Sequence, residues 1–156
     1  MKKYLIIAII FLAYGCGTDQ GPTKIYNYTI SNKSGYSIEI IPYNRQGNKE
    51  IDKKIILLNN QSLNQIHRDN PPYFSFTMTQ LLANKLNVLF LDKIEIVFNN
   101  SKNIIYNNDC DNTTGIPGNC SPRNIFLLKY SRDQIETYTI TPEDYQNAID
   151  CGGNCN

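Results

Sequence analysis

The stretch IYNYTIS, residues 25–31, decides the fold, because its side chains alternate between apolar and polar. On an extended chain Tyr26, Tyr28 and Ile30 fall on one face, while Asn27 and Thr29 fall on the other. A period of two is typical of a β-strand with one face buried and one face in water. We therefore predict a strand whose tyrosine face packs into a core or against a sheet edge.

Similar segments recur along the chain between turns rich in Asn, Gly and Ser. They are residues 37–43, 52–58, 73–78, 93–98, 103–106 and 136–141. In residues 73–78 the alternation predicts that Phe74, Phe76 and Met78 all point inward. Short strands separated by turn signals are typical of an antiparallel sandwich or barrel. We predict a mainly β fold: an antiparallel β-sandwich of immunoglobulin-like type with about seven strands and a short C-terminal helix.

Two segments depart from the strand pattern. Residues 141–144 (TPED) are typical of a helix start, with Thr as the N-cap, Pro at the first helical position and an acid at the third. This helix is expected to run to about residue 150 and to stop at the glycine pair 152–153. Residues 79–91 (TQLLANKLNVLFL) fit either a short helix or a buried strand, and their periodicity does not decide between the two.

The first fifteen residues have the organisation of a secretory signal. Lys2 and Lys3 precede an uncharged apolar run at residues 4–14. That run is about half as long as the roughly twenty residues that a membrane-spanning helix needs. A basic start followed by a short apolar run predicts a signal peptide that is removed from the mature chain.

Cys16 follows the small residues Ala13 and Gly15, in an arrangement that resembles the lipobox of bacterial lipoproteins. The resemblance implies a lipoprotein signal at residues 1–15, acylation of Cys16 and a lipidated tether at 16–23. The lipobox prefers Leu where this chain has Ala13, and ordinary signal peptidase would cut the same bond, so plain secretion is the alternative. Two or more acyl chains hold a protein firmly on a membrane.

The cysteine count agrees with a lipidated Cys16. Five cysteines are present, and an odd number in an exported protein leaves one thiol unexplained. Acylation of Cys16 leaves four, which suits two disulfides in an oxidising compartment. We expect Cys110, Cys120, Cys151 and Cys155 to form them, either as two local pairs or with the tail joined to the earlier loop. A four-thiolate metal site is the alternative, but zinc sites use shorter spacings.

Charge and size exclude some classes of partner. Loss of Lys2 and Lys3 with the leader turns 15 basic residues into 13, against 14 acidic ones. A net charge of 13 − 14 = −1 gives no electrostatic reason to expect nucleic-acid binding. The remaining residues, 24–156, are enough for a single β-rich domain with one core and a cysteine-containing tail.

Residues 109–114 (DCDNTT) form an oxygen-rich run whose side chains could suit calcium. The helix-loop-helix calcium motif needs Gly at position six and Glu at position twelve. Counted from Asp109, those positions hold Thr114 and Cys120. We therefore predict a solvated loop, with no metal and no cofactor bound.

Candidate catalytic groups are sparse. His67 is the only histidine, and with Arg68 and Asp69 it spells the kinase catalytic tripeptide, but no Gly-rich phosphate loop and no nucleophile elbow accompany it. We interpret the tripeptide as coincidence. Paired carboxylates are the remaining enzymatic hypothesis, since a glycosidase needs only two acids across a cleft. Tyr26, Tyr28 and Tyr138 lie on strand faces, where packing is a commoner role than ligand binding.

Three stretches give the chain a family resemblance: residues 28–35 (YTISNKSG), 94–102 (IEIVFNNSK) and 138–145 (YTITPEDY). In that order, behind a signal sequence, they resemble small, uncharacterised lipoproteins of Bacteroidota, Flavobacterium-like, with one β-rich domain. The resemblance implies an envelope β-domain and carries no catalytic residues. The cysteine-rich tail departs from the pattern.

We expect a membrane-anchored envelope lipoprotein that acts as a binding module and is not an enzyme. Its location is the bacterial outer membrane, held through the N-terminal lipid, on either the periplasmic or the surface side. Its expected partner is an envelope protein or a glycan. The alternatives are an inhibitor or immunity-type lipoprotein that uses the 110–120 loop, and a carboxylate-based hydrolase.

Overall fold

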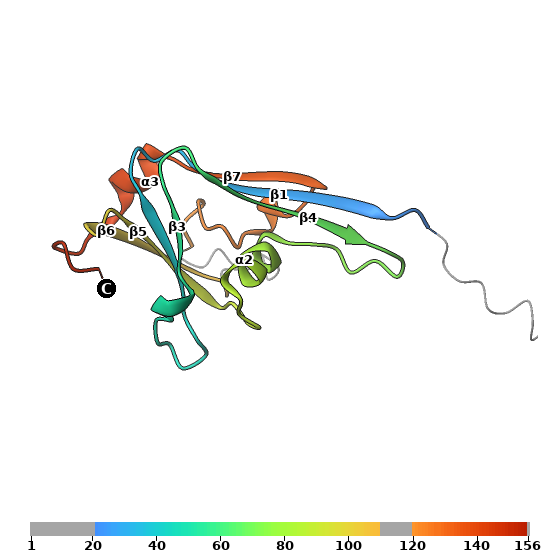
Figure 1. The fold of residues 1–156 in the computed structure, drawn as a ribbon, viewed down its shortest axis with the longest axis horizontal. Helices are drawn as coiled ribbons and strands as arrows, with labels where there is room; N and C mark the ends of the chain where they lie inside the picture. The colour runs from blue at the N-terminus through green and yellow to red at the C-terminus, as the bar shows by residue number, and fades with distance from the viewer. Residues whose placement is uncertain (1–20, 110–119, 156) are drawn as a thin grey trace, which may run out of the picture.

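The structure is a computed structural model that describes residues 21–109 and 120–155. Within these residues, eight strands form two sheets (Figure 1). One sheet has the order β4-β1-β7, and the other has the order β3-β2-β5-β6-β8. The strands are β1 (Lys24–Asn32), β2 (Ile38–Pro42), β3 (Ile55–Leu57), β4 (Ser62–Asp69), β5 (Lys93–Phe98), β6 (Lys102–Asn107), β7 (Ile135–Ile140) and β8 (Ile149–Asp150). The predicted β-sandwich is confirmed.

The helices are short. They are η1 (Ile51–Lys53), α2 (Met78–Leu86), η3 (Leu128–Tyr130) and α3 (Pro142–Asn147). Helix α2 answers the question that residues 79–91 left open: it starts at a Thr77–Gln80 capping box and ends at Asn87, which is left-handed with φ 54°. The predicted C-terminal helix is confirmed as α3, with the Thr141 capping box, but it ends at Asn147 and β8 follows it.

Strand pairing is antiparallel except at one place. β1 pairs with β4 antiparallel over eight residues, from Lys24–Asp69 to Ser31–Ser62. On its other side β1 pairs with β7 in parallel, from Asn27–Ile135 to Asn32–Ile140. β2, β3, β5, β6 and β8 are joined only by antiparallel ladders. The central strand of the three-stranded sheet is therefore the one predicted from residues 25–31.

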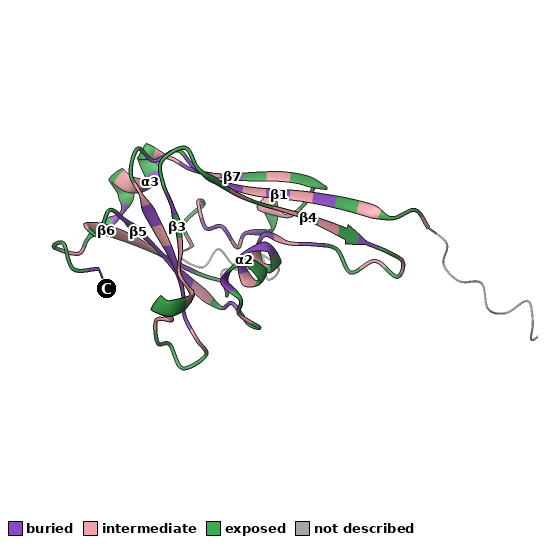
Figure 2. Ribbon diagram, in the orientation of Figure 1, coloured by how far each residue is buried: buried purple, intermediate pink, exposed green. Residues whose placement is uncertain are grey.

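The core lies between the two sheets, and α2 covers part of it. Figure 2 shows buried residues on β2, on β5 and on one side of α2, with exposed residues along the outer strands. The largest fully buried side chains include Tyr28, Ile30, Tyr138 and Phe98. Tyr28 donates its hydroxyl proton to the Asp133 carbonyl at 2.9 Å, so its polar end is satisfied. The predicted inward face of β1 is thus the core face.

The segment 73–78 is not a strand, and this prediction is wrong. Ser75 has a positive φ of 63°, which breaks the alternation between its neighbours. As a result Phe74 is 80% exposed while Phe76 is 2% exposed. Met78 is buried as predicted, but as the first residue of α2.

Two further strands differ from the predictions. β4 was not predicted, because its half-buried positions are Leu63, Gln65 and His67, of which only the first is apolar. β4 is an edge strand with one sheet neighbour, so it tolerates polar side chains on both faces. The run 52–58 contains only three strand residues, β3, because η1 occupies its beginning.

The chain passes from one sheet to the other at Asn32, whose side chain is fully buried. The amide nitrogen donates to the Tyr36 carbonyl at 2.8 Å and to the Leu57 carbonyl at 2.9 Å. The amide oxygen accepts from the Ser34 backbone N–H at 3.1 Å and from its hydroxyl at 2.7 Å. Both donors and both acceptor positions of the amide are used. This one side chain therefore joins the end of β1 to β3 in the opposite sheet.

We predict that Asn32→Ala lowers the free energy of unfolding by about 3 kcal/mol, because it leaves buried carbonyl groups without donors. Urea unfolding of the detergent-purified full-length protein, followed by circular dichroism, measures this change. Asn27→Ala is the matched control on the same strand, since the Asn27 hydrogen bond to Asn64 is exposed. Equal losses for the two variants would contradict the role of Asn32.

Candidate binding surface

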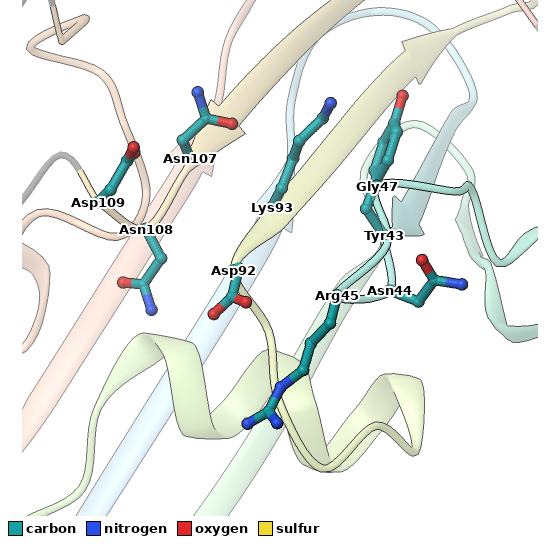
Figure 3. Close-up of a pocket in the computed structure, with 9 residues that line it drawn as sticks. All are labelled: Tyr43, Asn44, Arg45, Gly47, Asp92, Lys93, Asn107, Asn108 and Asp109. Atoms are coloured by element: carbon teal, nitrogen blue, oxygen red, sulfur yellow. The ribbon is translucent and has the colours of Figure 1, made fainter.

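The strongest candidate site lies where three loops meet at one end of the five-stranded sheet. These loops are residues 43–50 after β2, residues 87–93 between α2 and β5, and residues 107–109 at the end of β6. We call them together the loop-end surface. They surround a depression of about 480 Å³ (Figure 3). It is lined by Tyr43, Asn44, Arg45, Gly47, Asp92, Lys93, Asn107, Asn108 and Asp109.

The polar groups of this depression do not converge on one point. In Figure 3, Tyr43 and Lys93 point to one side of the ribbon, while Arg45 and Asp92 point to the other. The Lys93 ammonium lies 3.9 Å from the centre of the Tyr43 ring, where a cation–π contact orients it. Sites for small ligands aim a few polar groups at one enclosed volume. The arrangement suits contact with a larger surface better than capture of a small molecule.

A second depression of about 440 Å³ continues the first, because Asn44 and Arg45 line both. Its wall includes Leu89, which is 93% exposed, and Phe90, which is 57% exposed. The Arg45 guanidinium carbon lies 3.6 Å from the centre of the Phe90 ring. Two adjacent apolar side chains on the 87–93 loop and an arginine on the 43–50 loop are therefore presented to water side by side.

Local hydrogen bonds determine the shape of this surface. The Asn44 side-chain oxygen accepts from the backbone N–H groups of Gln46 and Asn48, both at 3.0 Å, and Gly47 supplies the positive φ of 82° that the turn needs. Asn108 bridges the other two loops: its N–H donates to the Asp92 carbonyl at 2.7 Å and its side chain to the Leu91 carbonyl at 3.2 Å. The exposed side chains thus stand on braced loops.

Beneath the loop-end surface, the Glu95 carboxylate is completely buried on β5. It accepts from the Tyr43 hydroxyl at 2.8 Å, from the Asn103 amide at 2.5 Å, and from the Lys49 ammonium at 2.9 Å. Lys49 also donates to the backbone carbonyl of Cys155. The Glu95 group therefore ties the 43–50 loop and the C-terminal tail to the outer face of the five-stranded sheet.

The electrostatics of Glu95 are set by these donors. Burial alone would raise the pKa of Glu95, but the hydrogen bonds from Lys49, Asn103 and Tyr43 outweigh burial and lower it below its ordinary value of 4.5. Burial, together with the hydrogen bond to Glu95, raises the pKa of the Tyr43 hydroxyl, which stays protonated and donating. A carboxylate that is ionised and saturated with donors serves as a structural anchor for the loop.

The structure places the other predicted residues away from this surface. His67 stacks on Phe76 with ring centres 4.6 Å apart, so it packs against the core. Tyr26, Tyr28 and Tyr138 are buried, which confirms the packing interpretation of these tyrosines.

The cysteine predictions are tested only in part. The Cys151 and Cys155 Cα atoms lie 5.2 Å apart, and the two residues form a disulfide. Cys120 is also disulfide-bonded. Cys16 and Cys110 lie outside the described residues, as does most of the oxygen-rich run, so acylation and the pairing of Cys110 stay predictions.

Buried acids bear on the hydrolase hypothesis. Among the described residues, three acids are buried: Asp69, Glu95 and Asp144. Asp69 accepts from the backbone N–H groups of Phe74 and Ser75, and Asp144 accepts from Arg123 at 2.7 and 2.9 Å. Each of these buried carboxylates accepts hydrogen bonds from residues packed around it, which is a structural role. Across residues 21–109 and 120–155, no cluster of three His, Cys, Asp or Glu side chains could hold a metal ion.

Sequence reasoning did not find the residues of the loop-end surface. Leu89 and Phe90 belong to the run 79–91, whose pattern fits either a short helix or a buried strand. The signal that separates them is Asn87, since Asn is second to Gly in its tolerance of the left-handed residue that ends a helix. Glu95 carried a signal too: a lone charge within an otherwise apolar strand needs partners once that strand is central.

Comparisons with known proteins add no family to this geometry. No protein-family model, no curated protein and no solved structure matches the chain. Of the helices that the structure describes, none is both long and apolar enough to cross a bilayer.

We predict that Glu95→Gln lowers the free energy of unfolding by about 2 kcal/mol at neutral pH, because a charged hydrogen-bond acceptor is lost. Since the pKa of Glu95 is lowered by folding, its stabilising effect is present above pH 4.5 and is lost as the pH falls below that value. The difference between wild type and variant should therefore shrink in acid. Urea unfolding at a series of pH values measures it.

Glu39→Gln is the control for this prediction. Glu39 contacts Lys54 at 2.9 Å, but both side chains are about one-quarter exposed, so the expected loss is below about 1 kcal/mol. A Glu95→Gln variant with the stability and acid sensitivity of the wild type would contradict the assigned role.

Proposed function

We propose that this chain is a lipid-anchored lipoprotein of the bacterial outer membrane, whose loop-end surface binds an envelope protein. The anchor is supported by the signal-like residues 1–15, by Cys16 behind Ala13 and Gly15, and by the odd cysteine count. The proposed relatives are the small Bacteroidota lipoproteins that the sequence resembles. The proposed role is binding without catalysis.

The exposure of Leu89 and Phe90 beside Arg45 is the observation that carries the binding role. Burying apolar side chains is the main driving force of protein association, and aromatic residues and arginine dominate the centres of interfaces. Because Asn44 and Asn108 brace the loops, little conformational freedom is lost on binding. A partner would find this contact area already formed.

A protein partner fits this surface better than a glycan. Sugars stack on an open aromatic face, and one face of the Phe90 ring is already covered by the Arg45 guanidinium group. Leu89, which is more exposed than Phe90, offers aliphatic contact area with no hydrogen-bonding group. Inhibition through the 110–120 loop stays a prediction, because residues 110–119 lie outside the described residues.

We predict that Cys16→Ser abolishes labelling of the protein by radioactive palmitate and releases it from the membrane fraction, because the acylated thiol is removed. Intact-mass measurement of the purified wild-type protein should show cleavage before Cys16 and added acyl chains. Cys155→Ser is the control, since it removes a disulfide but keeps the anchor. A wild-type protein that retains residues 1–15, or carries no lipid, would refute the anchor.

We also predict that the double change Leu89→Ser and Phe90→Ser reduces capture of the partner from native membranes about tenfold or more, because it removes the apolar centre of the contact. Crosslinking in intact cells followed by quantitative mass spectrometry measures this loss. The matched control is Ile56→Ser with Leu58→Ser, two exposed apolar residues outside the loop-end surface. If both double variants capture the same proteins in the same amounts, the loop-end surface is not the binding site.

A further inference from the structure

We infer that the loop of residues 70–75, between β4 and α2, inserts Phe74 into the headgroup region of the membrane that carries the anchor. We call this segment the membrane-proximal loop. The inference rests on the proposed acylation of Cys16 and adds a second, non-covalent membrane contact. Four observations support it: the position of the chain start, the held conformation of the loop, the exposure of Phe74 and the local charge.

The start of the described chain is fastened to the membrane-proximal loop. The Tyr73 hydroxyl donates to the Pro22 carbonyl at 2.6 Å, and the Thr23 hydroxyl donates to the Asn70 side-chain oxygen at 2.7 Å. A Cβ atom at Gly21 would overlap the Tyr73 hydroxyl, so only glycine fits there without a shift. Residues 21–23 thus lie against this loop and leave only residues 17–20 between the domain and Cys16.

The short remaining tether places this end of the domain next to the membrane. Five residue steps separate Cys16 from Gly21, and an extended chain covers at most about 3.5 Å per residue, or roughly 17 Å. In Figure 1 the N-terminal end of β1 and the loop that follows β4 lie together at the right, whereas the 43–50 and 87–93 loops lie at the lower edge. The loop, and not the loop-end surface, therefore faces the anchor.

The loop conformation directs Phe74 outward. The buried carboxylate of Asp69 accepts from the Phe74 N–H at 3.1 Å and from the Ser75 N–H at 2.9 Å. Ser75 has the positive φ that reverses the direction of the next side chain, so Phe76 enters the core and Phe74 does not. A strained residue held by a buried acid maintains the exposure of an aromatic ring that water disfavours.

The charges around the loop suit phospholipid phosphates. Lys24 lies with its ammonium group 4.0 Å from the centre of the Tyr73 ring, and the exposed Arg68 is paired in register with Ile25 at the same end of the sheet. Basic side chains next to an inserted aromatic ring favour a phosphate-rich surface. The occupant that fits this apolar tip with a basic rim is therefore the lipid headgroup region.

The test uses the absence of tryptophan from the chain. Phe74→Trp places a single tryptophan at the loop tip, and Phe90→Trp places a matched single tryptophan on the loop-end surface. Each full-length acylated protein is reconstituted into vesicles of phosphatidylethanolamine and phosphatidylglycerol, with or without brominated phosphatidylcholine. On reconstitution into vesicles, we expect the Phe74→Trp emission to shift to shorter wavelength and to be quenched by the brominated lipid. The Phe90→Trp emission should neither shift nor be quenched.

The outcomes separate this inference from the proposed anchor. Intact mass establishes acylation of Cys16 before the vesicles are made. An unmodified Cys16 would overturn the anchor and, with it, this orientation. An acylated protein whose Phe74→Trp probe is quenched no more than the Phe90→Trp probe would overturn the orientation alone.

Discussion

The fold depends on the buried amide of Asn32. The chain crosses between the two sheets at the β1–β2 turn and again at the β3–β4 connection, and Asn32 is bonded to both. Its side chain holds Tyr36 and Leu57, and its backbone pairs with Asn60 and Gln61. An amide with every donor and acceptor satisfied specifies one geometry, since any other would strand a buried polar group. The end of the domain next to residues 21–23 belongs to the three-stranded sheet and the loop-end surface to the other, so Asn32 sets how the two ends are placed.

The sequence predicts the strands that have one strongly apolar face. Apolar and polar side chains alternate along β1 and β5 because one side of each strand enters the core. The capping residues of α3 predict where that helix begins. The sequence does not predict β4, because it is an edge strand and can contain Asn, Gln and His. Its backbone hydrogen bonds to β1 hold it in the sheet. The segment 73–78 misleads because its pattern assumes a regular extended chain, whereas Ser75 takes a positive φ that no local composition requires. The parallel pairing of β1 with β7 joins residues too far apart in the sequence for any local pattern to specify.

The candidate site was less predictable than the fold, for a physical reason. Binding surfaces gather residues from several loops, and the neighbours of Arg45 are determined only when the α2–β5 loop folds over the β2 turn. In the sequence, Leu89 and Phe90 resemble core residues. They follow the end of α2, and composition does not tell whether the chain there turns toward the core or toward water. Glu95 likewise becomes interpretable only when β6 supplies Asn103 and the 43–50 loop supplies Lys49. The proposed lipid-attachment residue, Cys16, by contrast, is suggested by a local pattern alone.

The position of β1 has a mechanical consequence. β1 is the first strand after the tether and lies between β4 and β7, with ladders of eight and six residue pairs. A pull on the tether acts along the length of β1, so it loads the hydrogen bonds of both ladders together, in shear. Peeling, in which the bonds break one at a time, would require a pull across the strand. With the proposed anchor at Cys16, the membrane would therefore hold the domain through a strand that is hydrogen-bonded along both edges.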